Sequence, residues 1–121
     1  AWGLVIEEVR EGYARVSMRI RPDMLNGHGI AHGGMIFSLA DTAFAYACNS
    51  RNETTVAQCA TIVFIASARD GDLLVAEAEE RAGAGKSGVT NVSVRTQQGR
   101  AIAEFTGLSR TIGGSILPQA N

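Results

Sequence analysis

The sequence predicts a single α+β domain in which a curled antiparallel sheet of about six strands wraps around one long central helix. Residues 13–20 alternate between apolar and polar side chains, as a strand with one buried face does. Further segments of strand-like composition follow in the second half of the chain, separated by short stretches rich in turn residues. Residues 34–49 lie between these regions. They are rich in Ala, Leu, Met and Phe and contain no Pro.

The expected strands are residues 4–9, 13–20, 56–65, 73–81, 89–96 and 101–110. Glu11 and Gly12 provide a tight turn between the first two, and the later connections are also short, which favours antiparallel neighbours. We expect one domain over residues 1–121, with residues 111–121 as a loose C-terminal tail. The apolar residues of 34–49 populate most of the helical circumference, which indicates a helix buried nearly all round. A sheet curled around it would provide that burial.

Size and composition exclude several classes of function. The chain has 121 residues, a net charge of −1 and scattered Lys and Arg residues, so no basic stripe favours nucleic acid. Its apolar stretches are too short for a membrane span, and we expect a cytoplasmic protein without membrane partners. Cys48 and Cys59 stand among apolar residues and are interpreted as buried free thiols. No Cys/His cluster suggests a metal, and no cofactor is expected.

Asp41 is the only charged residue in the predicted helix. Burying a lone carboxylate costs several kcal/mol unless it is paired or neutralised. One interpretation is a structural Asp that is hydrogen-bonded in the core or faces water. The other is a general base or nucleophile in an apolar cleft, where desolvation would raise its pKa.

His32, Gly33 and Gly34 stand where this helix begins. The first amides of a helix are unpaired and carry partial positive charge, and glycine lets a ligand approach the backbone closely. Such an end can hold a carbonyl oxygen that becomes an oxyanion. A Gly-Gly pair before a helix is also compatible with a plain tight turn.

The spacing of Gly33 and Asp41 restricts how they could act together. They are eight positions apart, which is about 12 Å along a helix. A carboxylate that far from the helix end cannot attack a carbonyl bound there. If both serve one reaction, they come from different chains of a symmetric dimer, with Gly33 of one subunit facing Asp41 of the other.

The loop before the helix contains further candidates. Asn26 beside Gly27 is typical of a turn, but its amide could also orient an attacking water or the substrate. His28 and His32 could each serve as a base. We favour His32 as a residue that braces the turn through a hydrogen bond.

The segment LNGHGIAHGGMIFSLADTAFAYACNS, residues 25–50, closely resembles the PaaI-type thioesterases of bacterial phenylacetate degradation. The resemblance extends more loosely through the strands to SRTIGG at residues 109–114. It implies a hot-dog fold, a sheet wrapped around a central helix. It also implies that Asn26, Gly33 and Asp41 form the catalytic set with His32 in support. The resemblance further implies a tetramer built from dimers, with sites at the dimer interface.

The resemblance implies hydrolysis of phenylacetyl-CoA or its ring-hydroxylated relatives to free acid and coenzyme A, with coenzyme A as part of the substrate. A related branch that cleaves hydroxybenzoyl-CoA has Gln where this chain has Asn26, Glu at Asp41 and Thr at Ala45, which disfavours that branch. Asp41 would either deprotonate a water or attack the carbonyl directly, and the sequence leaves both routes open.

Candidate substrate contacts follow from this interpretation. The Gly33–Gly34 amides would hold the thioester carbonyl, and Phe37, Phe44 and Tyr46 could line an apolar acyl pocket, although core packing explains each of them equally well. Lys86 and Arg110 could hold the phosphates of coenzyme A, with solvated surface charge as the alternative.

Two other functions compete with hydrolysis. A hot-dog dehydratase or hydratase would resemble a pattern with His-Phe-Pro-Gly, but neither Pro22 nor Pro118 follows a His. A non-catalytic acyl-CoA-binding or regulatory module is the second alternative. Asp41 argues against it, because binding alone gives no reason to bury a carboxylate.

Overall fold

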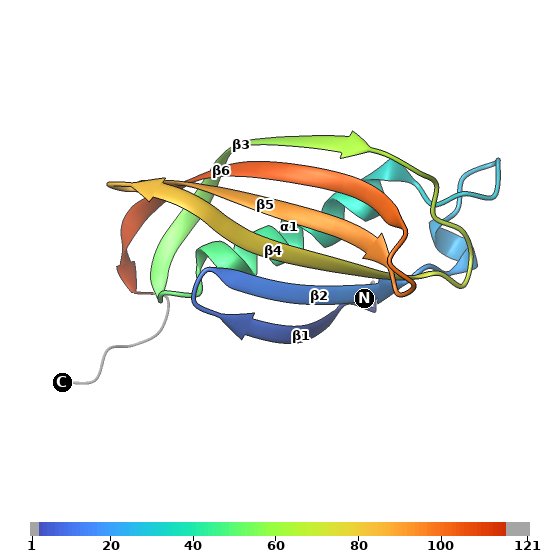
Figure 1. The fold of residues 1–121 in the computed structure, drawn as a ribbon, viewed down its shortest axis with the longest axis horizontal. Coiled ribbons are helices and arrows are strands. Elements are labelled where there is room, and N and C mark those ends of the chain that lie inside the picture. Colours follow the sequence, from blue (N-terminus) through green and yellow to red (C-terminus); the bar gives the residue numbers. More distant parts are fainter. Residues whose placement is uncertain (1–2, 116–121) are drawn as a thin grey trace.

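The computed structural model describes residues 3–115. In that range the order of elements is β1 (Val5–Arg10), β2 (Tyr13–Arg19), the 3-10 turn η1 (Pro22–Met24), α1 (Gly33–Cys48), β3 (Glu53–Phe64), β4 (Leu73–Ala84), β5 (Ser87–Thr96) and β6 (Ala101–Ser115). The strands form one antiparallel sheet in the order β1-β2-β4-β5-β6-β3. The sheet curls around α1, which confirms the predicted fold class (Figure 1).

The core lies between the concave face of the sheet and one side of α1. Cross-strand neighbours share a face, and the register aligns Ala76 with Val16 on one side and Val94 on the other. The buried residues of α1 that pack against this face are Ile36, Leu39, Ala40, Ala43, Phe44, Ala47 and Cys48. The alternation of β2 predicted this arrangement, because every second residue of the strand points toward the helix.

The other side of α1 is exposed, which differs from the expected helix buried all round. Phe37, Ser38, Ala45 and Tyr46 are exposed there. β3, which contacts α1, is an edge strand and is exposed on both of its faces over most of its length. We call these four helix residues together with β3 the uncovered face. The composition of the helix predicted apolar surroundings, and the single chain supplies them on one side only.

The expected C-terminal tail begins later than predicted. β6 continues through Ser115, because residues beyond Arg110 still pair with β3, including Thr111 with Thr55. The hydroxyls of these two threonines also lie 3.2 Å apart within hydrogen-bond distance. Residues 116–121 of the expected tail lie outside the described residues.

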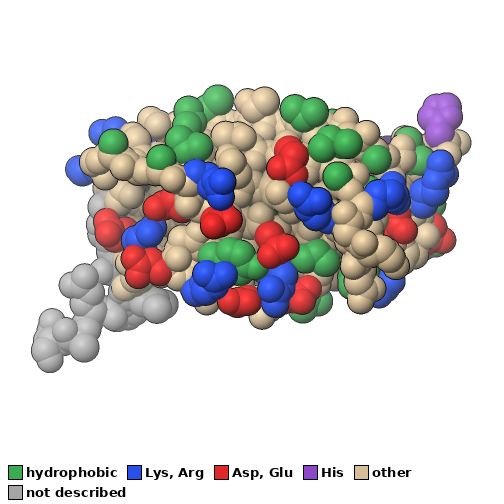
Figure 2. All heavy atoms as spheres, in the orientation of Figure 1, with side chains coloured by type: hydrophobic (Ala, Val, Ile, Leu, Met, Phe, Trp, Pro, Cys, Tyr) green, Lys and Arg blue, Asp and Glu red, His purple; other side chains and the backbone are tan. Residues whose placement is uncertain are grey.

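The convex face of the sheet carries acidic and basic side chains side by side (Figure 2). Arg15, for example, lies near both Glu7 and Glu8. This interspersed pattern leaves no large surface of one sign on the face that Figure 2 shows. Within residues 3–115, no helix is both long and apolar enough to cross a membrane.

Candidate active site

The N-terminus of α1 presents backbone amides that make no hydrogen bond within residues 3–115. Met35 and Ile36 donate hydrogen bonds to the carbonyl of His32, at 3.0 and 3.4 Å. The amides of Gly33 and Gly34 precede them and have no carbonyl one turn earlier that a helix could offer. Together with the helix dipole, these two N–H groups form a site suited to a carbonyl oxygen that gains negative charge.

Gly33 also lies in close contact with an aromatic ring. A Cβ atom placed on Gly33 would lie 3.1 Å from Cζ of Phe64, the last residue of β3. The ring of Phe64 therefore lies against the glycine backbone at the point where the helix begins. A larger residue at position 33 would force this ring to move.

The loop before α1 is organised by Asn26. Its Oδ1 accepts hydrogen bonds from the backbone N–H groups of His28, at 2.8 Å, and Ile30, at 3.4 Å. Its backbone N–H donates to the carbonyl of Ile30 at 2.8 Å. No hydrogen bond of the described residues involves the Nδ2 amide. Asn26 is thus a turn residue, as one interpretation held, and its amide donors remain available to a ligand.

Asn26 and Gly33 line the same cavity, which has a volume of about 360 Å³. The other lining residues are mostly apolar, and they are Ile30, Ala31, Ile36, Phe64, Ile65, Ala66 and Ser67. A mostly apolar cavity with a few convergent donors is typical of a small-molecule site. The structure brings these two predicted residues together, whereas Asp41 is not part of the lining.

Asp41 lies in the third turn of α1, at the border between the buried side and the uncovered face. It is half-buried, next to exposed Ser38 and Ala45 on the helix surface. Desolvation by burial raises its pKa above the ordinary value of 3.8. Its carboxylate makes no ion pair within the described part of the chain. Such a group is a better proton acceptor than a surface Asp.

The side chain of His32 does not brace the turn. It is exposed and makes no capping hydrogen bond. The backbone of His32 fixes the turn instead, because its N–H donates to the carbonyl of Met24 at 3.0 Å and its carbonyl receives the first helical bonds. His28 is exposed as well, and it contacts Asn26 through its backbone N–H.

The aromatic residues predicted for an acyl pocket occupy different environments. Phe44 is 2% exposed and packs against the backbone of Gly107 and the ring of Phe105, so it is a core residue rather than part of a pocket wall. Phe37 contacts Phe105 edge-on, with ring centroids 5.5 Å apart, and is partly exposed on the uncovered face. Tyr46 is exposed on the same face.

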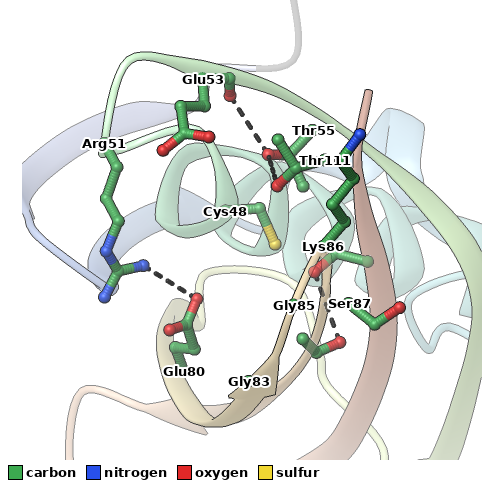
Figure 3. A pocket seen from close by; sticks show the side chains of 12 residues that line it. Cys48, Arg51, Glu53, Thr55, Glu80, Gly83, Gly85, Lys86, Ser87 and Thr111 are labelled. Carbon is green, nitrogen blue, oxygen red and sulfur yellow. Dashed lines mark hydrogen bonds and ion pairs between the residues drawn. The ribbon is translucent and has the colours of Figure 1, made fainter. Parts of the chain in front are cut away.

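Lys86 lines a second cavity, of about 410 Å³, near the C-terminal end of α1 (Figure 3). Cys48, Thr55 and Thr111 line it. Arg51 and Glu80 also line it and form an ion pair, with Nη1 of Arg51 2.9 Å from Oε2 of Glu80. Its lining contains charges of both signs. Arg110 is exposed and pairs with Ser87 across β5 and β6, so it lies at the same end of the sheet.

The two cysteines differ from each other. Cys48 is buried, as predicted, and Cys59 is exposed, contrary to the prediction, because it lies on edge strand β3 opposite Leu108. Burial raises the pKa of the Cys48 thiol. Among the residues that the structure describes, no cluster of three or more His, Cys, Asp or Glu side chains could hold a metal.

Phe64 is the residue of this region that the sequence interpretation missed. The strand alternation contains a weak signal for it, since Ile62 and Phe64 share the face that points toward α1. Nothing in the sequence pattern, however, indicates that the end of β3 lies against Gly33. That contact depends on the position of β3 at the edge of the curled sheet.

Comparison with known proteins identifies the family. Residues 28–103 match the thioesterase superfamily. This chain belongs to that superfamily. The thioesterase is 45% identical over 120 residues to the acyl-coenzyme A thioesterase PaaI of Escherichia coli, covering 99% of this chain and 86% of PaaI.

Solved structures agree with this assignment. The PaaI protein of the E. coli phenylacetic acid degradation operon matches with a TM-score of 0.93 at 45% identity, covering 96% of the thioesterase and 84% of that chain. A hypothetical thioesterase of Streptococcus pneumoniae, solved with coenzyme A, matches with a TM-score of 0.87 at 25% identity, covering 93% and 90%. The resemblance to PaaI-type thioesterases is confirmed, and the chain is a thioester hydrolase with the hot-dog fold.

Proposed function

We propose that this thioesterase hydrolyses phenylacetyl-CoA or its ring-hydroxylated relatives to the free acid and coenzyme A. The cavity that Asn26 and Gly33 share carries the proposal. Its apolar wall suits an aryl group, and its two polar members suit a thioester carbonyl. The similarity to an acyl-coenzyme A thioesterase from a phenylacetic acid degradation operon supports the same substrate class.

In the proposed complex the thioester carbonyl points at the start of α1. The Gly33 amide donates to the carbonyl oxygen, and Nδ2 of Asn26 supplies a second donor from across the cavity. Both donors become more valuable as the oxygen gains negative charge during attack. Loss of one such donor typically costs about 3–4 kcal/mol of transition-state stabilisation.

Asp41 of a second subunit completes the proposed site. Within one chain Asp41 is about 12 Å along α1 from Gly33, too far to reach a carbonyl bound there. A two-fold dimer through the uncovered face would place each Asp41 beside the partner's helix start. The exposure of Phe37, Tyr46 and both faces of β3 supports this contact, because such apolar surface is typical of an interface. Two such dimers would form the proposed tetramer.

The chemistry has two possible routes. In the first, Asp41 removes a proton from water, the resulting hydroxide attacks the carbonyl carbon, the C–S bond breaks, and the thiolate of coenzyme A takes up the proton. In the second, the carboxylate of Asp41 attacks the carbonyl carbon and expels the thiolate, and water then hydrolyses the mixed anhydride. The raised pKa of Asp41 supports the first route more directly, since it makes the carboxylate a stronger base.

Lys86 and Arg110 remain the candidates for the phosphates of coenzyme A. Neither side chain makes an ion pair with another described residue, whereas Arg51 is paired with Glu11 and Glu80. Lys86 and Arg110 both lie near the C-terminal end of α1. In the proposed dimer, that end extends past Asp41 and lies beside the N-terminus of the partner's helix. The carboxylates of Glu53 and Glu80 in the same cavity oppose an anion, so Lys86 is expected to contribute modestly.

A thiol-release assay tests the proposal. Wild-type protein should release coenzyme A from phenylacetyl-CoA, while Asp41→Asn should be at least about 100-fold slower with unchanged binding. Asp70→Asn, an exposed Asp in the turn before β4, is the matched control and should match wild type. Binding of phenylacetyl-CoA without thiol release by wild type would contradict the proposal and favour a binding module.

Isotope labelling can detect the anhydride route. Single-turnover hydrolysis in ¹⁸O water places label only in the product acid if Asp41 acts as a base. Label in the Asp41 carboxylate, measured by mass spectrometry of the digested enzyme, would identify the anhydride route.

A further inference from the structure

Among the described residues, the wall of the Asn26–Gly33 cavity contains one aromatic side chain, and it comes from β3 rather than from α1. We propose that Phe64 is the specificity-determining residue of this thioesterase, whose ring binds the aryl part of the acyl group and selects aryl over saturated acyl thioesters. This inference rests on the proposed function, because it assumes that the acyl group occupies the Asn26–Gly33 cavity.

Proximity to Gly33 is the first argument. The ring of Phe64 approaches Gly33 so closely that a Cβ there would lie 3.1 Å from Cζ and 3.5 Å from Cε1. A carbonyl oxygen bound by the Gly33 amide would place the attached acyl carbon next to this ring. Gly33 and Phe64 line the same cavity, so a substituent on that carbon that enters the cavity can pack against the ring of Phe64.

The backbone of Phe64 is held by the sheet, whereas its ring is partly exposed. Phe64 pairs with Ala103 of β6, and the next residue, Ile65, donates its N–H to the carbonyl of Ile102 at 2.8 Å. The sheet thus fixes where the side chain starts. Phe64 is 51% exposed in the single chain, so part of its ring can contact an acyl group that enters the cavity at the edge of the proposed dimer interface. Offset or edge-on packing of two aromatic rings is favourable beyond simple burial of area.

The other aromatic candidates fit this role less well. Phe44 is buried under Gly107, and Phe37 already uses its ring against Phe105. Tyr46 is five residues after Asp41, which places it well around the helix from the carboxylate. None of the three lines the cavity that contains Asn26 and Gly33, whereas Phe64 does.

The experiment compares two acyl groups of nearly equal size, phenylacetyl-CoA and cyclohexylacetyl-CoA. Wild type should prefer the aryl substrate in kcat/KM, and Phe64→Leu should reduce that preference by about 10-fold, mainly through the aryl substrate. Phe64→Tyr, which keeps the ring, should retain the preference. Val9→Ala is the control, because Val9 is exposed on β1, at the opposite edge of the sheet from β3, and should leave the ratio unchanged.

The outcomes distinguish failure of this inference from failure of the proposed function. A Phe64→Leu variant that keeps the wild-type ratio, or that slows both substrates equally, overturns the inference and leaves the proposed function in place. Wild-type protein that cleaves neither substrate overturns the proposed function and the inference with it. Sedimentation of each variant shows whether the assembly is intact, so a lost preference in an intact assembly supports the role of Phe64.

Discussion

Gly33 and Asp41 lie on the same helix, yet only Gly33 lines the cavity that also contains Asn26. Asp41 follows Gly33 by eight positions in α1, about 12 Å of helical rise. The uncovered face of α1 carries the carboxylate at its border, where a second copy of the chain could reach it. Experiments can therefore test whether the proposed catalytic groups come from one chain or from two.

Mixed dimers test whether the two groups come from different chains. Asp41→Asn and Asn26→Asp should each be nearly inactive as homodimers. A mixed dimer of the two, isolated with two affinity tags, contains one site with both native residues and one site with neither. It should therefore have about half of the wild-type activity per dimer in the thiol-release assay.

The matched control is a mixed dimer of wild type with Asp41→Asn, which should also have about half of the activity. If Gly33, Asn26 and Asp41 acted within one chain, the doubly mutated mixed dimer would be inactive while this control stayed half-active. That result would contradict the shared site.

Two substitutions separate the turn-forming role of Asn26 from its proposed role as a hydrogen-bond donor to the substrate. Asn26→Asp keeps an oxygen that can accept from the N–H groups of His28 and Ile30 but removes the Nδ2 donors. We expect kcat to fall by about 100-fold or more with little change in thermal stability, because an oxyanion donor is lost and a negative charge is added. Asn26→Ala removes the acceptor as well, and calorimetry should show an additional loss of about 1 kcal/mol. Equal stability of the two variants would mean that the loop does not depend on Oδ1.

The sequence predicted the parts of the fold that depend on local periodicity. The alternation of residues 13–20 predicted β2 to within one residue, and the apolar segment 34–49 predicted α1 with the same accuracy. The spacing of Gly33 and Asp41 is likewise a local quantity, so the helix fixes it once the helix is recognised. The resemblance over residues 25–50 then supplied the family, which the comparisons confirm.

Features that depend on distant pairing were not predictable in this way. Cys59 was expected to be buried, but the alternation of a strand does not reveal that the strand lies at the edge of a sheet. The extension of β6 beyond Arg110 depends on pairing with the start of β3, such as Thr111 with Thr55, which lies far earlier in the chain. Phe64 was missed for the same reason, since its contact with Gly33 joins the end of β3 to the start of α1.

Gly107 should be essential for stability. A side chain at this position would overlap the ring of Phe44, which packs directly on the backbone of β6. Gly107→Ala should therefore lower the free energy of unfolding by about 1–3 kcal/mol, measured by urea denaturation. Gly34→Ala is the contrast, because a Cβ there meets no atom within 4 Å, and its helical position should make it neutral or slightly stabilising. Destabilisation of the same size by both substitutions would show that the Phe44 contact is not the cause.

Asp41 should show opposite effects on activity and stability. Burial raises its pKa above the ordinary value of 3.8, and both routes require the carboxylate. The acid limb of kcat/KM should therefore lie above that value, with activity falling as the pH falls through the raised pKa. For stability, the folded protein binds more protons than the unfolded chain between the two pKa values, so the free energy of unfolding decreases as pH rises through this window.

Asp41→Asn removes that burial cost because its side chain is never charged. The variant should be inactive yet more stable than wild type at neutral pH. Its advantage should shrink as the pH falls from the raised pKa of Asp41 toward the ordinary Asp value, and it should vanish below that value, where the wild-type group is protonated in both states. Thermal unfolding of both proteins across this pH range measures the difference. A variant that is less stable than wild type at neutral pH would mean that the carboxylate makes stabilising contacts in the assembly, for example hydrogen bonds to the partner's helix start, that outweigh its desolvation.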